Sequence, residues 1–275
     1  MESISVVSEP IPFRERPKGT TYSGKCRGNQ IAGVFPSVGA SPASARMEQT
    51  LIPGPISLIG PPGAGKGTQA KLLMALWSIP QVSAGDLLRD MRRDPEKAAS
   101  PLGREIRASM DAGRLIPDEL VQAVVLDRLR QPDTRRGYVL DGFPRTLRQA
   151  MWLDQELNRE KDKLPAITIG IRVHHTKLSG RIRGRRHCPN CLRIYNTHSC
   201  LPERDMVCDV DGTALVLRPD DTAEVLGERM RTYEEMTLPV IDHYRGTARF
   251  VEVNGELPVD DITRAITDAI ADFRN

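Results

Sequence analysis

Short apolar runs alternate along the chain with longer segments in which apolar residues recur at helical spacing. The apolar runs predict strands at residues 56–59, 81–83, 137–140, 166–173 and 250–253. Helical spacing is found at residues 70–76, 86–112 with breaks near Pro95 and Pro101, 119–130 with Asp118 as the N-cap, 147–158 and 262–273. Strands that alternate with helices predict an α/β fold with a five-stranded parallel sheet flanked by helices on both faces.

The first predicted strand ends in a glycine-rich turn. Residues 60–68 read Gly-Pro-Pro-Gly-Ala-Gly-Lys-Gly-Thr. The glycines can adopt backbone angles that side chains forbid, so their N–H groups can converge on a phosphate at the start of the following helix. Lys66 adds a positive charge for the outer phosphates. The hydroxyl stands at Thr68 and not directly after Lys66, which argues against GTPases and motor ATPases.

Composition limits the remaining possibilities. The 275 residues are 39% hydrophobic and 27% charged, as in an ordinary globular protein, and the net charge of +3 is too small to indicate a nucleic-acid partner. No apolar run approaches the ~20 residues that cross a bilayer. Residues 1–50 lack periodicity and predict a disordered extension before a folded domain at 51–275. The extension resembles a transit peptide only weakly, and Met47 offers an internal translation start.

Four of the five cysteines fall within one short window, which favours a metal site over disulfides. Cys188 and Cys191 form one knuckle, and Cys208 and Asp211 repeat its spacing sixteen residues later. Four such ligands predict a tetrahedral structural zinc site with no open position for water. The competing candidates for the fourth ligand are Cys200, His187 and His198.

Phosphate chemistry also explains a carboxylate and a set of arginines. Asp141 ends the third predicted strand, at the edge where open α/β sheets bind ligands, although a residue in this position can also simply cap a turn. Guanidinium groups bind phosphate oxygens bidentately, and phosphoryl transfer needs positioning and charge neutralisation more than a covalent partner. The arginines that stand near turns or element ends are Arg89, Arg145, Arg181, Arg185, Arg218 and Arg229.

Together these motifs resemble the adenylate kinase family from about residue 54 to 273. The matching stretches are Gly60–Gln69, Ser83–Arg89, Asp141–Thr146, Arg181–Arg186 and Arg218–Asp221. The resemblance implies a P-loop fold with a helical monophosphate-binding insertion at 83–113 and a lid at 184–221 that holds the zinc site. It implies a bacterial, cytoplasmic and monomeric enzyme that converts MgATP and AMP reversibly into two ADP and so maintains adenine nucleotides.

The resemblance also implies roles for individual residues. Catalysis would use Lys66, Asp141, which would orient magnesium through water, and Arg145, Arg185, Arg218 and Arg229. ATP would contact Gly63, Ala64, Gly65, Lys66, Gly67, Thr68, Arg185, Ile194, Tyr195 and Leu257. AMP would contact Ala84, Arg89, Arg114, Leu115, Ile116, Gly142, Phe143, Pro144, Arg145, Gln149, Arg218 and Arg229.

Two alternatives follow from particular residues. Ala84 stands where adenylate kinases commonly have threonine, and in this it resembles UMP/CMP kinases; Thr146, Gln149 and the long lid favour AMP. A zinc-ribbon module that binds nucleic acid would use the cysteine window and the arginines at 181–186. It leaves the phosphate loop and the turn at 141–145 unexplained.

Overall fold

The structure, a computed structural model, describes residues 51–111, 116–159, 164–191, 193–217, 221 and 223–275. The predicted extension at 1–50 lies outside these residues, as do Arg114, Leu115 and Arg218. None of the described helices is long and apolar enough to span a membrane.

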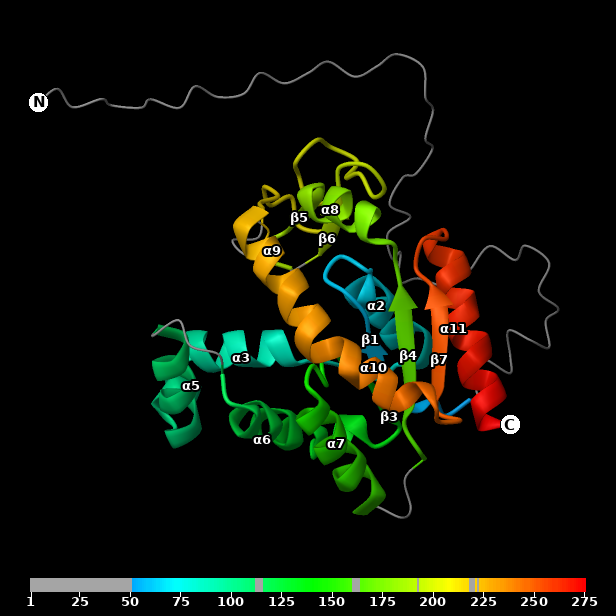
Figure 1. The fold of residues 1–275 in the computed structure, drawn as a ribbon. Helices are drawn as coiled ribbons and strands as arrows, with labels where there is room; N and C mark the ends of the chain where they lie inside the picture. The colour runs from blue at the N-terminus through cyan, green and yellow to red at the C-terminus, as the bar shows by residue number, and fades with distance from the viewer. Residues whose placement is uncertain (1–50, 112–115, 160–163, 192, 218–220, 222) are drawn as a thin grey trace, which may run out of the picture.

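A five-stranded parallel sheet forms the centre of the molecule and confirms the predicted architecture (Figure 1). Its strands lie in the order β2-β3-β1-β4-β7. Their bounds are β1 (Gly54–Ile59), β2 (Gln81–Ser83), β3 (Gly137–Asp141), β4 (Ile167–Arg172) and β7 (Phe250–Asn254). All six residues of β1 are buried, as expected of a central strand that is covered on both faces.

Helices cover both faces of the sheet through apolar side chains. On one face, α2 (Lys66–Trp77) and α11 (Val259–Arg274) pack in the same apolar cluster as β1 and β4. On the other face, α6 (Asp118–Leu129), α7 (Leu147–Arg159) and α10 (Leu238–Arg245) contribute to two further clusters. The short helix η1 (Pro132–Thr134) connects α6 to β3.

One insertion lies beside the sheet, and a second lies beyond the carboxyl end of the strands (Figure 1). The first contains α3 (Ala84–Arg93), α4 (Pro95–Ala99) and α5 (Pro101–Asp111), which break at the two predicted prolines. The second follows α8 (His175–Arg183) and contains an antiparallel hairpin of β5 (Arg185–His187) and β6 (Ile194–Asn196). The chain returns to the sheet through α9 (Ala223–Thr232) and the π-helical turn η3 (Tyr233–Thr237).

The prediction of Asp118 as an N-cap is wrong. Helix α6 begins at Asp118 and its N-cap is Pro117, whose carbonyl accepts from the N–H groups of Leu120 and Val121. The Asp118 carboxylate instead accepts hydrogen bonds from Thr146 Oγ1 at 2.8 Å and Gln149 Nε2 at 2.6 Å. These donors come from α7 and the turn before it, so tertiary contact has replaced local capping.

Candidate active site

The glycine-rich turn joins β1 to α2 and forms a compact loop around the Lys66 side chain. Lys66 Nζ donates to the carbonyls of Gly60 at 2.6 Å and Pro61 at 3.0 Å. Gly63 has a φ of +80°, and a Cβ atom there would lie 2.8 Å from Ile182 Cγ1 on α8. A side chain at this position would therefore be strained and would also clash with the base of the second insertion. The loop has the form that the sequence predicted for a phosphate site at the start of α2.

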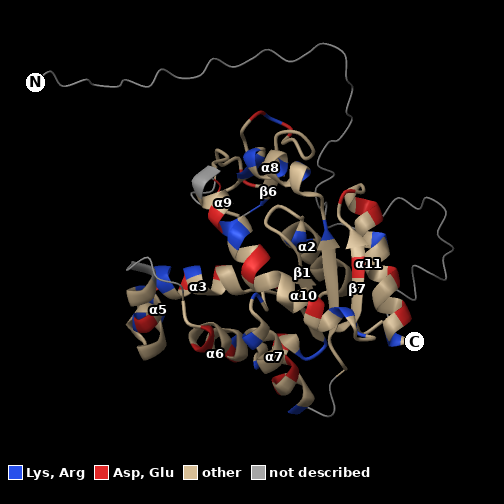
Figure 2. Ribbon diagram, in the orientation of Figure 1, with Lys and Arg blue, Asp and Glu red and all other residues tan. Residues whose placement is uncertain are grey.

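The charged residues from three distant segments converge on Lys66. Burial lowers the pKa of Lys66 to about 8; the charge of Asp141 acts in the opposite direction, and those of Arg145, Arg229 and Arg185 lower it further. These residues therefore lie within electrostatic reach of one amine. Figure 2 shows basic residues in α3, α8 and α9, the elements near this end of the sheet.

Asp141 lies at the carboxyl end of β3, beside the phosphate loop. In the parallel register it is opposite Leu58 of β1, one residue before that strand ends. Gln81 Nε2, from the neighbouring strand β2, donates to Asp141 Oδ2 at 2.9 Å. A Cβ atom on Gly67 would lie 3.2 Å from the same oxygen, so the carboxylate reaches the start of α2. A magnesium ion carried by a nucleotide would meet an oxygen ligand here.

A buried carboxylate holds two of the arginines together. Asp221 Oδ2 accepts from Arg185 Nε at 2.7 Å, and its Oδ1 accepts from Arg185 Nη2 and, at 3.4 Å, from Arg229 Nη1. The Asp221 side chain is 0% exposed. The sequence predicted no role for Asp221, although this residue closes the motif at 218–221. The sequence signal that could have identified Asp221 is its position in the Arg218–Asp221 motif, where an acid follows an arginine expected to bind phosphate.

The predicted AMP residues surround the turn between β3 and α7. Gly142, with a φ of +73°, accepts at its carbonyl from Arg145 Nε at 2.8 Å. Phe143, Pro144 and Gln149 are buried behind this turn. On the first insertion, Ala84 is buried at the start of α3 in the same apolar cluster as Phe143, and Arg89 pairs with Asp86.

The residues predicted beside ATP lie on several elements. Ala64 is buried within the loop, and Gly65 is the N-cap of α2. Ile194 Cδ1 would lie 3.9 Å from a Cβ atom on Gly67, so the hairpin meets the phosphate loop. The Tyr195 side chain is 1% exposed and donates to Cys208 Sγ at 3.5 Å, which leaves its main chain for any nucleotide contact. Leu257, between β7 and α11, is exposed.

The cysteine window forms one compact group. The ligand atoms of Cys188, Cys191, Cys208 and Asp211 all lie within 4.8 Å of one another. Three sulfur atoms and one carboxylate oxygen suit tetrahedral zinc. Hydrogen bonds, chiefly from the Thr213 N–H, lower the pKa of Asp211 and favour its anionic form. Among the described residues, the competing candidates Cys200, His187 and His198 are not part of this group.

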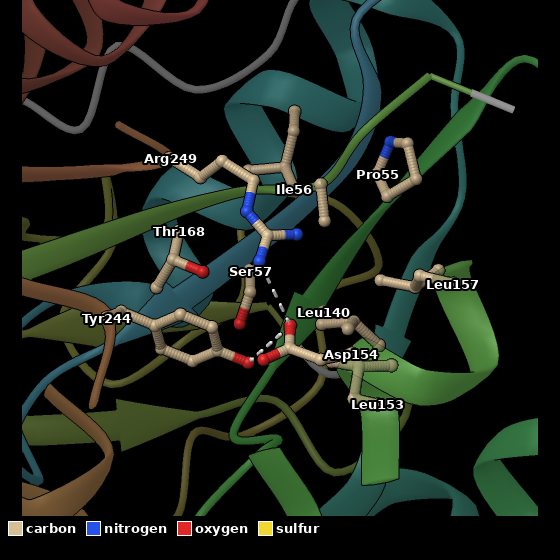
Figure 3. A pocket seen from close by; sticks show the side chains of 11 residues that line it. Pro55, Ile56, Ser57, Leu140, Leu153, Asp154, Leu157, Thr168, Tyr244 and Arg249 are labelled. Carbon is tan, nitrogen blue, oxygen red and sulfur yellow. Dashed lines mark hydrogen bonds and ion pairs between the residues drawn. The ribbon is translucent and has the colours of Figure 1, made fainter. Parts of the chain in front are cut away.

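A small internal cavity lies apart from this site, between the sheet and α7 and α10 (Figure 3). Its volume of about 10 Å³ is room for roughly one water molecule. Asp154 carries an oxygen that accepts from Tyr244 Oη at 3.4 Å and lies 3.7 Å from Arg249 Nη2. The cavity is too small for a nucleotide, so the phosphate loop remains the candidate site.

The loop, the carboxylate and the arginines at the carboxyl end of this parallel sheet define a P-loop nucleotide-dependent phosphotransferase. The model of the family described as "Adenylate kinase" matches residues 58–249. The chain is 39% identical over 211 residues to an adenylate kinase of Kosmotoga olearia, covering 77% of this chain and 96% of the relative. The chain is also 43% identical over 208 residues to an adenylate kinase of Nitrosococcus oceani, and this match covers 75% of this chain and 92% of the relative. The chain belongs to the adenylate kinase family.

Proposed function

We propose that the protein catalyses the reversible transfer of a phosphoryl group from MgATP to AMP, giving two ADP. The observation that carries this proposal is the convergence of Asp141, Arg145, Arg185 and Arg229 around Lys66. The relatives named above are adenylate kinases and not pyrimidine nucleotide kinases. A zinc-ribbon module that binds nucleic acid would not explain this cluster of charges or the phosphate loop.

In the reaction, an oxygen of the AMP phosphate attacks the γ-phosphorus of ATP, and the bond from that phosphorus to the β–γ bridging oxygen breaks. Residues 63–68 would bind the ATP phosphates through main-chain N–H groups, and Lys66 would neutralise the transferring group. Asp141 would hold, through water, the magnesium ion that accompanies ATP and that supplies charge neutralisation on the phosphate oxygens.

The arginines divide between the two substrates. Arg89 and Arg145 would bind the AMP phosphate, while Arg185 and Arg229 would stabilise the charge that spreads over the transferring oxygens. Gln149 would read the adenine of AMP in a pocket that Ala84 and Ile116 help to line. Ile194 and Leu257 would border the ATP base, and closure of the lid would exclude water as a competing acceptor.

The domain limits, the lid metal and the cellular setting are parts of the same proposal. Residues 51–275 form the catalytic domain, with the monophosphate-binding segment at 83–113 and the lid at 184–221. A structural zinc ion held by Cys188, Cys191, Cys208 and Asp211 would stabilise the lid. A monomeric, cytoplasmic enzyme is the form that the resemblance to bacterial adenylate kinases supports.

A coupled assay of ADP formation tests the proposal. ATP, magnesium and AMP should give ADP, with AMP preferred over CMP and UMP. Arg145→Ala should abolish turnover while the circular dichroism spectrum stays that of the native protein, because Arg145 is exposed and its side chain is not part of the core. Absence of ADP, preference for a pyrimidine, or near-normal turnover of the variant would each contradict the corresponding part of the proposal.

A further inference from the structure

The side-chain amide of Gln149 lies between two partners of opposite kind. Its Oε1 accepts from the main-chain N–H of Arg145 at 2.8 Å, and its Nε2 donates to Asp118 Oδ1 at 2.6 Å. A main-chain N–H can only donate and a carboxylate can only accept. The direction of the amide is therefore set by chemistry: turning it by 180° would put two donors together at one end and two acceptors together at the other.

The two groups that bind the amide, the Asp118 carboxylate and the main chain of Arg145, are fixed by further hydrogen bonds. The second oxygen of Asp118 accepts from Thr146 Oγ1 at 2.8 Å, and the same hydroxyl oxygen accepts from the main-chain N–H of Gln149 at 3.1 Å. The carbonyl of Arg145 accepts from Thr237 Oγ1 at 3.0 Å, which joins the turn to η3. Gln149 is 4% exposed. The amide is thus fixed by groups from α6, α7 and the turn before α7.

The amide has two N–H groups and two oxygen lone pairs, and the two described bonds use one of each. One donor and one acceptor remain, with the nitrogen on the Asp118 side and the oxygen on the Arg145 side. The edge of adenine offers an acceptor at N1 and a donor at its 6-amino group, which complements this pair. A 6-oxo purine offers a donor at N1 and an acceptor at O6, which is the reverse.

We propose that Asp118 is a specificity-determining residue: it locks the Gln149 amide so that 6-amino purine monophosphates are accepted and 6-oxo purine monophosphates are rejected. This rests on the proposed function, in which Gln149 reads the base of AMP. A glutamine that was free to rotate would bind either edge. Asp118 is a positioning residue, since it acts on the base only through Gln149.

The test compares AMP with inosine monophosphate as acceptors, with saturating MgATP. Because a site that leaves buried polar groups unpaired rejects the wrong ligand strongly, the unmodified protein should favour AMP by ~100-fold or more in kcat/KM. In Asp118→Asn, the new amide can present its own NH₂ to Gln149, so a reversed Gln149 amide keeps a partner at this end, and only the Arg145 N–H still opposes the reversal. The AMP-to-IMP ratio should fall by ~10-fold or more, chiefly through KM for the acceptor, with KM for ATP unchanged.

Glu119→Gln is the matched control. It neutralises the next carboxylate on the same helix, which pairs with the exposed Arg148 and takes no part in the lock. It should keep the AMP-to-IMP ratio of the unmodified protein.

An unmodified protein that uses inosine monophosphate about as well as AMP would overturn the lock, and so would an Asp118→Asn variant that keeps the original ratio. If the variant does not fold, the first comparison can still overturn the lock, because a protein that does not discriminate between the two acceptors has no lock. Both outcomes require an active AMP kinase and leave the proposed function intact. Failure of that function would appear separately, as no ADP from ATP and AMP.

Discussion

The positive charge of Lys66, which is proposed to neutralise phosphate, lies in an environment that disfavours the protonated amine. Burial and the neighbouring arginines lower its pKa to about 8, so the free enzyme loses the ammonium charge as the pH rises through that value. We expect kcat/KM for MgATP to fall above pH ~8. Bound phosphates favour the charged form, so kcat at saturating ATP should hold to higher pH. Steady-state pH profiles measure both, and a kcat/KM that stays flat to pH 10 would contradict the assigned role.

Lys66 also makes a prediction for stability, with a definite sign. A base whose pKa is lowered on folding binds fewer protons in the native state than in the unfolded state between the two pKa values. The free energy of unfolding should therefore gain a positive contribution as the pH rises from about 8 towards 10.5. Urea unfolding of the nucleotide-free protein across this range measures it. Lys66→Met should lack this contribution, and an identical rise in the variant would assign it to other groups.

Asp221 is expected to act through the two arginines that it holds. Asp221→Asn keeps the shape of the side chain, but its NH₂ end meets guanidinium N–H groups and cannot accept from them. Arg185 and Arg229 should then leave their common orientation. We expect kcat to fall by roughly 10- to 100-fold, less than the ~10²- to 10³-fold that follows removal of a stabilising donor itself, because both arginines remain present. Retention of near-normal kcat in a folded variant would show that Asp221 is only structural.

At the residue scale, the sequence predicted the groups that follow from local chemistry. The phosphate loop and Lys66 are contiguous, and the spacing of the proposed metal ligands was visible in one window. The partners of these groups were not predictable: Gln81 meets Asp141 across 60 residues, and Asp118 meets Gln149 across 31. Such pairs depend on how helices and strands are placed, which local patterns do not contain.

Among the described residues, the lid has only a small apolar core of its own. Its strands β5 and β6 have three residues each, and its buried cluster is Cys188, Tyr195, Cys208 and Leu215, so two of its four members are proposed metal ligands. A small unit of this kind needs a metal in place of apolar burial. Chelation should lower the thermal midpoint by several degrees, and KM for MgATP should rise more than KM for AMP. Calorimetry and steady-state kinetics measure these effects.

Two neighbouring carboxylates provide a control for the lid. Asp211→Asn should reduce zinc content and reproduce the effect of the chelator. Asp209→Asn should do neither, because Asp209 Oδ1 accepts from the Glu203 N–H at 2.8 Å and lies outside the four-ligand group. Equal zinc content in the two variants would exclude Asp211 as a ligand.

Element boundaries were predictable where the chain carries its own signals. The first insertion breaks at Pro95 because Asp94 caps α4 through the N–H groups of Glu96 and Lys97. The start of α6 was missed by one residue because Pro117, which has no capping side chain, ends the preceding segment. An acid before a helical pattern does not by itself distinguish a cap from a residue whose partners are distant.

At the scale of the whole molecule, the parallel sheet followed from the alternation of strands and helices. The strand order could not be predicted from this alternation, because it depends on the side of β1 on which each following strand is placed. The order β2-β3-β1-β4-β7 places β3 and β4 on either side of β1, and the resulting geometry brings the turn after β3 to the phosphate loop. The site is therefore a consequence of topology acting on motifs that are far apart in the sequence.

The opposite end of the sheet is closed by Arg274, near the end of α11. Its guanidinium donates to the carbonyl of Pro53 at 2.8 and 2.5 Å and to that of Pro165 at 2.8 Å, ahead of β1 and β4. Gly54 makes room for it, since a Cβ atom there would lie 2.7 Å from Arg274 Nη2. Burial lowers the pKa of Arg274 to about 10. One side chain thus fastens the last helix to the start of two central strands.

Arg274→Met should therefore weaken the whole fold and leave the chemistry unchanged. Methionine keeps most of the aliphatic volume but leaves the buried Pro53 carbonyl without these donors, at a cost of roughly 1–3 kcal/mol. For a domain of this size each kcal/mol lowers the thermal midpoint by about 2–4 °C. Arg264→Met, on the same helix, removes only an exposed pair with Asp261 and should change the midpoint little. Equal midpoints for the two variants would show that Arg274 is only a surface residue, whereas a loss of kcat in Arg274→Met would show that this end of the sheet communicates with the site.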